Sequence, residues 1–148
     1  MHKRLLLIFA SLAISGIANA GVYTDDLSRC LVESSTASDK TTLVKWMFTS
    51  MALHPEVKSM SNVTPKQRDI ANKAVADMFM KLMTETCLVQ SKKAIQYEGE
   101  FAIQQGFTIL GQVAGKELFA NPNVAQALSG LGEHIDGEKL ASALGISK

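Results

Sequence analysis

The stretch TPKQRDIANKAVADMFMKLM, residues 64–83, contains the clearest helix signal in the chain. It opens with Thr64 as a cap residue, a proline at the first helical position and Gln67 three residues after the cap, which together form a capping box. Apolar residues follow at the three- and four-residue spacing of one helix face: Ile70, Ala71, Ala74, Val75, Met78, Phe79, Leu82 and Met83. We expect a long amphipathic helix that continues to Tyr97, since no proline or glycine occurs before Gly99.

Helices are also predicted on both sides of this stretch. Upstream, one helix begins at Thr24 as its cap and ends near Ser34. A second, capped by Ser38 or Asp39, runs over 40–53 and is apolar nearly all round, so we expect it at the centre of the core. His54-Pro55 ends it, because the residue before a proline disfavours the helical region, and a loop is predicted over 55–63.

Further helices are predicted downstream, over 101–119, 123–131 and from the cap Asp136 to Leu144. Gly106, Gly111 and Gly115 interrupt the first of them, which predicts tight packing against another helix. No stretch alternates in the way a strand does. The fold class we expect is all-α, a compact bundle of five to six helices in one domain covering residues 21–148.

The N-terminus has the layout of a cleavable signal peptide over residues 1–20. Lys3 and Arg4 precede an apolar run that is too short to cross a bilayer, and Ala18-Asn19-Ala20 places small residues at the cleavage position. We expect cleavage between Ala20 and Gly21 and a mature protein that is periplasmic or secreted, with no membrane span. An uncleaved amphipathic anchor is the alternative.

The two cysteines, Cys30 and Cys87, both lie in the exported part, where an oxidising compartment allows one bridge. We predict a Cys30–Cys87 disulfide that is structural, because no C-x-x-C spacing marks a redox-active pair. The bridge requires the helices that carry these residues to lie side by side.

The charge of the mature chain excludes one class of partner. Without Lys3 and Arg4, the 15 basic residues of the full chain become 13 against 14 acidic residues, a net charge of −1. Nucleic-acid binding requires clustered basic residues that neutralise phosphates, and no such cluster is present. We expect no nucleic-acid partner.

Catalytic and metal-binding patterns are also missing from the sequence. It has no nucleophile elbow, phosphate loop or H-E-x-x-H motif, so we expect no catalytic, cofactor or metal residues and a protein that is not an enzyme. His54 is a weak candidate for chemistry, and its other interpretation is a cap at the carbonyl end of the helix before it. A copper site of thioethers is an alternative for Met47, Met51, Met78 and Met83, although their apolar spacing favours the core.

Residues 101–132 contain only two charged residues, Lys116 and Glu117. A segment so poor in charge is either deeply buried or forms a partner surface. The candidate residues of that surface are Phe101, Phe107, Gly111, Gly115 and Phe119.

Three short segments carry a resemblance to known sequences: 26–32 (DLSRCLV), 43–48 (LVKWMF) and 54–57 (HPEV). Across residues 25–60 the chain resembles uncharacterised small exported, periplasmic helical proteins of Gram-negative bacteria. The resemblance implies a periplasmic setting and no known activity. The function we expect is a small non-enzymatic binding or interaction protein, inhibitor-like or immunity-like, whose partner is another exported protein or a second copy. The alternatives are a periplasmic acid or envelope-stress chaperone, and an enzyme or copper-binding carrier.

Overall fold

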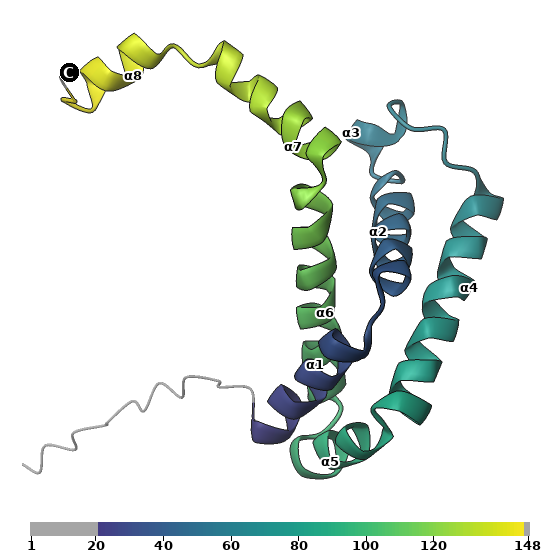
Figure 1. Cartoon of the computed structure of the whole chain (residues 1–148). Coiled ribbons are helices and arrows are strands. Elements are labelled where there is room, and N and C mark those ends of the chain that lie inside the picture. Colours follow the sequence, from purple (N-terminus) through teal and green to yellow (C-terminus); the bar gives the residue numbers. More distant parts are fainter. Residues whose placement is uncertain (1–20, 147–148) are drawn as a thin grey trace, which may run out of the picture.

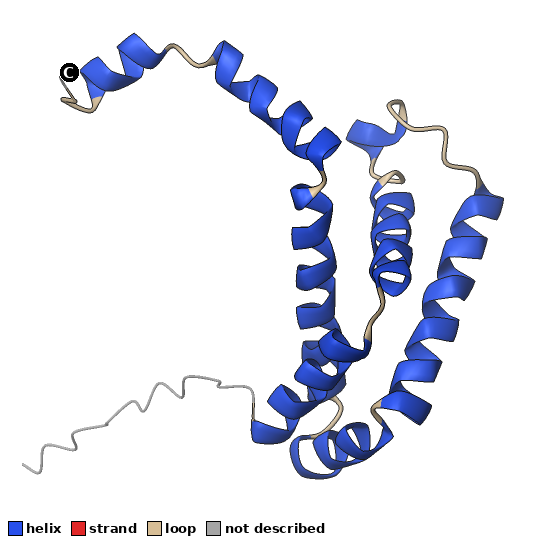
Figure 2. Ribbon diagram, viewed as in Figure 1, coloured by secondary structure: helices blue, strands red, loops and turns tan. Residues whose placement is uncertain are grey.

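The computed structural model describes residues 21–146, and these are helical with no strand (Figures 1 and 2). The predicted signal peptide lies outside the described residues. The elements in chain order are α1 (Val22–Ser34), α2 (Ala37–Met51), α3 (Pro55–Lys58), α4 (Pro65–Lys81), the π-helical turn η1 (Leu82–Thr86), α5 (Leu88–Glu98), α6 (Phe101–Ala120), α7 (Pro122–Ser129), the 3₁₀ helix η2 (Gly130–His134) and α8 (Gly137–Ala143). The all-α class is confirmed, but the described part has eight α-helices, where five to six were expected.

One reason for the larger number is that the long helix predicted from residue 64 to 97 is broken. In η1 the amide of Cys87 donates to the carbonyl of Leu82 at 2.7 Å, five residues back, and Cys87 has non-helical angles of φ −109° and ψ 25°. A π-turn inserts one extra residue into the helix and rotates the residues after it about the helix axis. The second reason is that the predicted loop 55–63 contains the short helix α3.

The disulfide between Cys30 and Cys87 is confirmed. It joins α1 to the junction of η1 and α5, with a Cα–Cα distance of 5.9 Å. The Cys87 side chain is fully buried. Such a bridge is consistent with an oxidising compartment. Because the break at Cys87 bends the chain, α1 packs along α5 rather than along α4 (Figure 1).

The centre of the core is α1, not the 40–53 helix that the sequence favoured. Leu27 and Leu31 of α1 are fully buried and pack with α6. In α2 only Leu43 is buried, while Phe48 is 55% exposed. The prediction about α2 was wrong because the helix is only partly covered: Trp46 and Met47 line one open surface pocket and Phe48 lines another.

Some of the helix caps are formed by the residues that the sequence predicted, and others are not. The Thr64–Gln67 capping box of α4 is confirmed, and Asp136 caps α8 as predicted. The cap of α2 is Thr36, in a capping box with Asp39, rather than Ser38 or Asp39. His54 does not cap the end of α2. Its Nδ1 accepts a hydrogen bond from the backbone amide of Glu56 at 3.3 Å and so caps the start of α3.

The last three elements, α7, η2 and α8, form an arm over residues 122–146. The arm leaves the bundle at the Asn121-Pro122 junction and runs away from it, at the upper left of Figure 1. It has no buried residue, and the main contacts of its first helix are with α6 and η2. The expected compactness therefore applies to α1–α6 and not to the arm. Across the described residues, no helix is both long enough and apolar enough to span a membrane.

Candidate functional site

An apolar groove of about 830 Å³ lies between α2, α4 and α6. We call it the groove. Its walls are uncharged: Leu43, Trp46 and Met47 from α2, Asn72, Val75, Ala76 and Phe79 from α4, and Gln104, Phe107, Thr108, Gly111 and Gln112 from α6. An open apolar surface with a neutral polar rim is typical of a binding groove for an apolar segment.

The floor of the groove is held by two side-chain contacts. Phe79 of α4 and Phe107 of α6 meet with ring centroids 4.5 Å apart, which joins the two helices at the base. Trp46 donates its indole N–H to Oδ1 of Asn72 at 2.9 Å, which ties α2 to α4. The aromatic rings are therefore oriented before any partner arrives, which reduces the ordering cost of binding.

The glycines of α6 differ in what they contact. A Cβ at Gly106 would lie 2.9 Å from Leu31 Cδ1, so the predicted need for close packing holds there. At Gly111 and Gly115 a Cβ would meet nothing within 4 Å, so packing among the described residues does not explain these two glycines. Gly111 lines the groove, and Gly115 lies one turn further along α6. A glycine inside a helix costs up to about 1 kcal/mol relative to alanine.

The predicted partner surface is divided by the fold. Phe107 and Gly111 come together in the groove, whereas Phe101 and Phe119 lie near opposite ends of α6 and are each more than half exposed. The inward face of α6 is buried through Ala102, Gly106, Leu110 and Ala114. The groove residues of α2 and α4 were not among those predicted, because apolar helical spacing does not distinguish a core stripe from an open one.

The arm carries an apolar stripe that sequence reasoning also missed. Val124, Leu128, Leu131 and Ile135 follow at intervals of four, three and four residues. The exposed fractions of Leu128 and Leu131 are 56% and 68%, and those of Leu140 and Leu144 are 50% and 63%. The signal was present in the sequence as this spacing, but nothing in the sequence showed that the stripe would be left without a partner.

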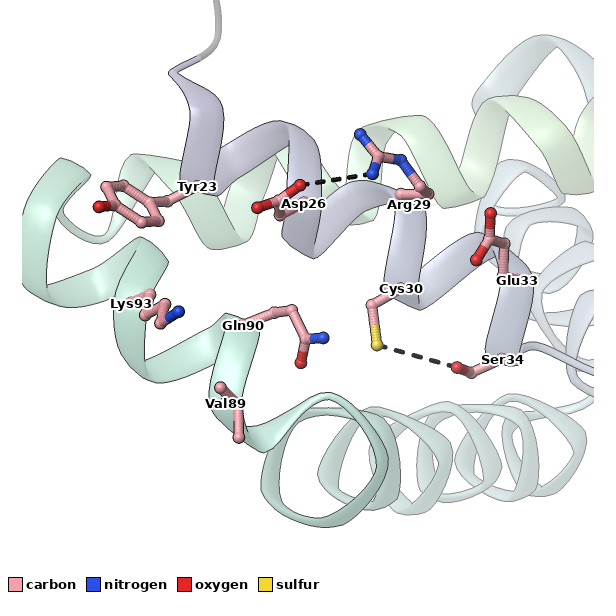
Figure 3. Close-up of a pocket in the computed structure, with 9 residues that line it drawn as sticks. All are labelled: Tyr23, Asp26, Arg29, Cys30, Glu33, Ser34, Val89, Gln90 and Lys93. Carbon is pink, nitrogen blue, oxygen red and sulfur yellow. Dashed lines mark hydrogen bonds and ion pairs between the residues drawn. The ribbon is translucent and has the colours of Figure 1, made fainter.

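A second, polar pocket of about 370 Å³ lies between α1 and α5 (Figure 3). Its charges alternate in sign. Asp26 and Arg29 pair at 3.5 Å, both well exposed, and Glu33 and Lys93 add one charge of each sign. Cys30 Sγ lies 3.8 Å from Ser34 Oγ at the pocket wall. Because its charges balance, this pocket presents no field of one sign to attract a charged ligand.

The weak candidates for metal binding are spread over the fold. Within residues 21–146, no three His, Cys, Asp or Glu side chains come together as a metal site. Met78 and Met83 are buried in the core, and Met47 is half-buried in the groove wall. Met51 is 61% exposed, so its predicted place in the core was wrong. His54 lies on the surface as the cap of α3.

Comparison of the chain with protein-family models, curated proteins and solved structures finds no match.

Proposed function

We propose that this protein is a small, exported, non-enzymatic interaction protein whose groove binds an apolar helical segment of a protein partner. The groove is the observation that carries the proposal. It combines an aromatic floor, a neutral rim and a length suited to about two turns of helix, since Asn72 and Phe79 are seven residues apart on α4.

The chemistry of the groove supports a protein segment over a small charged molecule. Its lining has no ionisable side chain, and its polar groups are the amides and hydroxyl of Asn72, Gln104, Thr108 and Gln112. Helices that dock in grooves use apolar anchors at spacings of three and four residues and leave polar groups at the rim. Aromatic side chains such as those of Trp46 and Phe107 are enriched at protein interfaces.

Site-specific photo-crosslinking in living cells tests this proposal. A photo-reactive amino acid is introduced at position 76, an exposed residue of the groove wall, and the full chain is expressed with its N-terminal segment. The matched control carries the same residue at position 96, exposed on α5 and outside the groove. A discrete adduct at 76 that is missing at 96 is expected. Equal labelling at both positions, or none at either, would show that the groove binds no protein.

A stress chaperone is the second candidate, and the exposed arm is the observation that favours it. Exposed apolar side chains hold unfolded clients by the same hydrophobic contacts that drive folding. If the arm acts in this way, the mature protein suppresses aggregation of reduced insulin and the Leu128→Glu variant does not. Equal suppression by both proteins, or none by either, contradicts this role.

A further inference from the structure

We infer that the groove is occupied by the arm of a second copy of this chain, so that two molecules exchange their arms and form a symmetric dimer. This inference rests on the proposed function, since it names the partner of the same groove. It joins two apolar surfaces of the described chain that are open to solvent: the groove on α2, α4 and α6, and the stripe on residues 124–135.

The two surfaces match in charge. No residue that lines the groove is ionisable, and the arm has no ionisable residue from Asn121 through Gly132. The first charged side chain of the arm is Glu133. A charged segment would lose its hydration in this groove without gaining an ion pair, so a neutral apolar helix is the occupant that it favours.

The two surfaces also match in length. With a rise of about 1.5 Å per residue, the eight residues of α7 span about 12 Å. The groove wall on α4, from Asn72 to Phe79, spans about 10 Å on the same basis. Leu128 near the end of α7 and Leu131 in η2 are only three residues apart, so both can enter the groove at the same time.

The connection at Asn121 keeps Leu128 of α7 out of the groove of its own molecule. The nearest groove residue on α6 is Gln112, nine residues before Asn121, a distance of about 13 Å along the helix. An α7 folded straight back from Asn121 would place Leu128 about 10 Å along α6, short of Gln112 and well short of Phe107. Of the two leucines, only Leu131 in η2 would reach the level of Gln112. A second molecule can bring its arm in from outside, and the arm already extends away from the bundle (Figure 1).

The glycines of α6 support a helix docked at this place. Gly111 lines the groove, and a Cβ atom added to it would have no neighbouring heavy atom within 4 Å. Small residues allow two helices to approach closely, and within residues 21–146 no helix uses the space beside Gly111. Reciprocal exchange fills both grooves of the pair, so one contact is made twice across a two-fold axis.

The first test is the concentration dependence of mass and tryptophan fluorescence in the mature protein. Trp46 is the only tryptophan in the chain and lines the groove, so its emission reports occupation directly. We expect a dimer by sedimentation, with a blue-shifted emission that moves to the red as dilution releases monomers. Leu128→Glu should weaken the dimer by on the order of 100-fold or more, because both arms lose the burial of a leucine. Gln126→Glu adds the same charge away from the stripe and should leave the dimer intact.

Mixing two variants then distinguishes the exchange of arms between two molecules from an arm that fills the groove of its own molecule. Leu128→Glu blocks the arm and leaves the groove unchanged, whereas Ala76→Glu blocks the groove and leaves the arm unchanged. Both positions are exposed, so each variant should fold as the wild type does. Each variant alone should be monomeric. Their mixture should form a one-to-one dimer with one filled groove, which native mass spectrometry detects by the mass difference.

The outcomes distinguish this inference from the proposed function. A mixed dimer, together with a crosslink from position 76 to a peptide of residues 122–146 of another copy, supports both. A monomer at every concentration whose position 76 crosslinks to a different protein overturns the exchange and keeps the function. A blue-shifted emission that Leu128→Glu abolishes but dilution does not would show that the arm fills its own groove. A dimer that is indifferent to both Leu128→Glu and Ala76→Glu also overturns the inference.

Discussion

Glu98, the last residue of α5, accepts two hydrogen bonds from Thr24 in the first turn of α1. The Thr24 hydroxyl donates at 2.5 Å and its backbone amide at 2.8 Å, and the amide of Tyr23 adds a third bond at 3.0 Å. The first amides of a helix have no partner inside it, and a carboxylate there also interacts favourably with the helix dipole. Glu98 therefore takes the capping role that the sequence assigned to Thr24, whose side chain is buried inside the helix.

The Thr24 hydroxyl bond is the main cause that lowers the pKa of Glu98 below its ordinary value of 4.5. Partial desolvation opposes it, and the amides of Tyr23 and Thr24 lower the pKa further. A carboxyl whose folded pKa is depressed stabilises the fold above its unfolded pKa, and this contribution is lost as the pH falls through the folded value. The stabilisation by Glu98 is therefore complete at neutral pH, begins to decrease as the pH falls below the unfolded value of about 4.3, and is lost as the pH falls through the lower pKa of the folded protein.

The first prediction concerns this carboxylate. Glu98→Gln should lower the melting temperature at pH 7, because the amide accepts fewer and weaker bonds than a charged carboxylate. The difference from the wild type should be smaller at pH 3 than at pH 7, because pH 3 lies below the unfolded pKa and part of the contribution of Glu98 is already lost there. Thermal unfolding by circular dichroism at both pH values measures the effect, with Glu100→Gln as the exposed control. An unchanged difference at pH 3 would show that the charge of Glu98 does not matter.

The second prediction concerns the residue that the sequence places first in the mature chain. A methyl group on Gly21 would overlap the Glu98 carboxylate, so the backbone nitrogen of Gly21 lies within roughly 5 Å of it. Cleavage after Ala20 turns that nitrogen into an ammonium group. A chain that begins at Gly21 should therefore unfold at a higher temperature than the same chain with an acetylated N-terminus. The Glu98→Gln background serves as control, because acetylation should have little effect there.

The third prediction separates two glycines of α6. Gly111→Ala should stabilise the monomer by up to about 1 kcal/mol, because alanine favours the helix and meets nothing there. Gly106→Ala gains the same propensity but pushes against Leu31, which is fully buried and has no free space, at a cost of about 1–3 kcal/mol. Urea unfolding in the Leu128→Glu background compares the monomers. If Gly106→Ala proves as stable as Gly111→Ala, the core relaxes around Leu31 at little cost.

The fourth prediction concerns the disulfide. It closes a loop with a sequence separation of 57 residues, so its removal should lower the free energy of unfolding by about 4 kcal/mol on the chain-entropy model. Urea unfolding of the Cys30→Ala/Cys87→Ala double variant measures this change, because it leaves no buried thiol. The oxidised wild type should have an intact mass two hydrogens below its reduced form. A loss smaller than about 1 kcal/mol would mean that α1 and α5 hold together without the bridge.

Much of the fold follows from local sequence patterns. The Thr64–Gln67 capping box, the Asp136 cap and the start of α6 at Phe101 lie where their residues predict them, because a helix cap is made by side chains within about three residues of one another. The Cys30–Cys87 bridge follows from their number alone, since two cysteines of one chain can form only one intramolecular pair.

Only the tertiary structure decided the features that bear on function. The cap of α1 is formed by Glu98, which lies 74 residues after Thr24. No local sequence pattern predicts a contact between residues so far apart in the chain. The same limit applies to the groove: the spacing in α2, α4, α6 and the arm showed that each has an apolar face, but not which faces would be covered. Hydrophobic attraction has no direction, so a sequence specifies that an apolar face must be buried, whereas the packing of the whole chain determines what buries it.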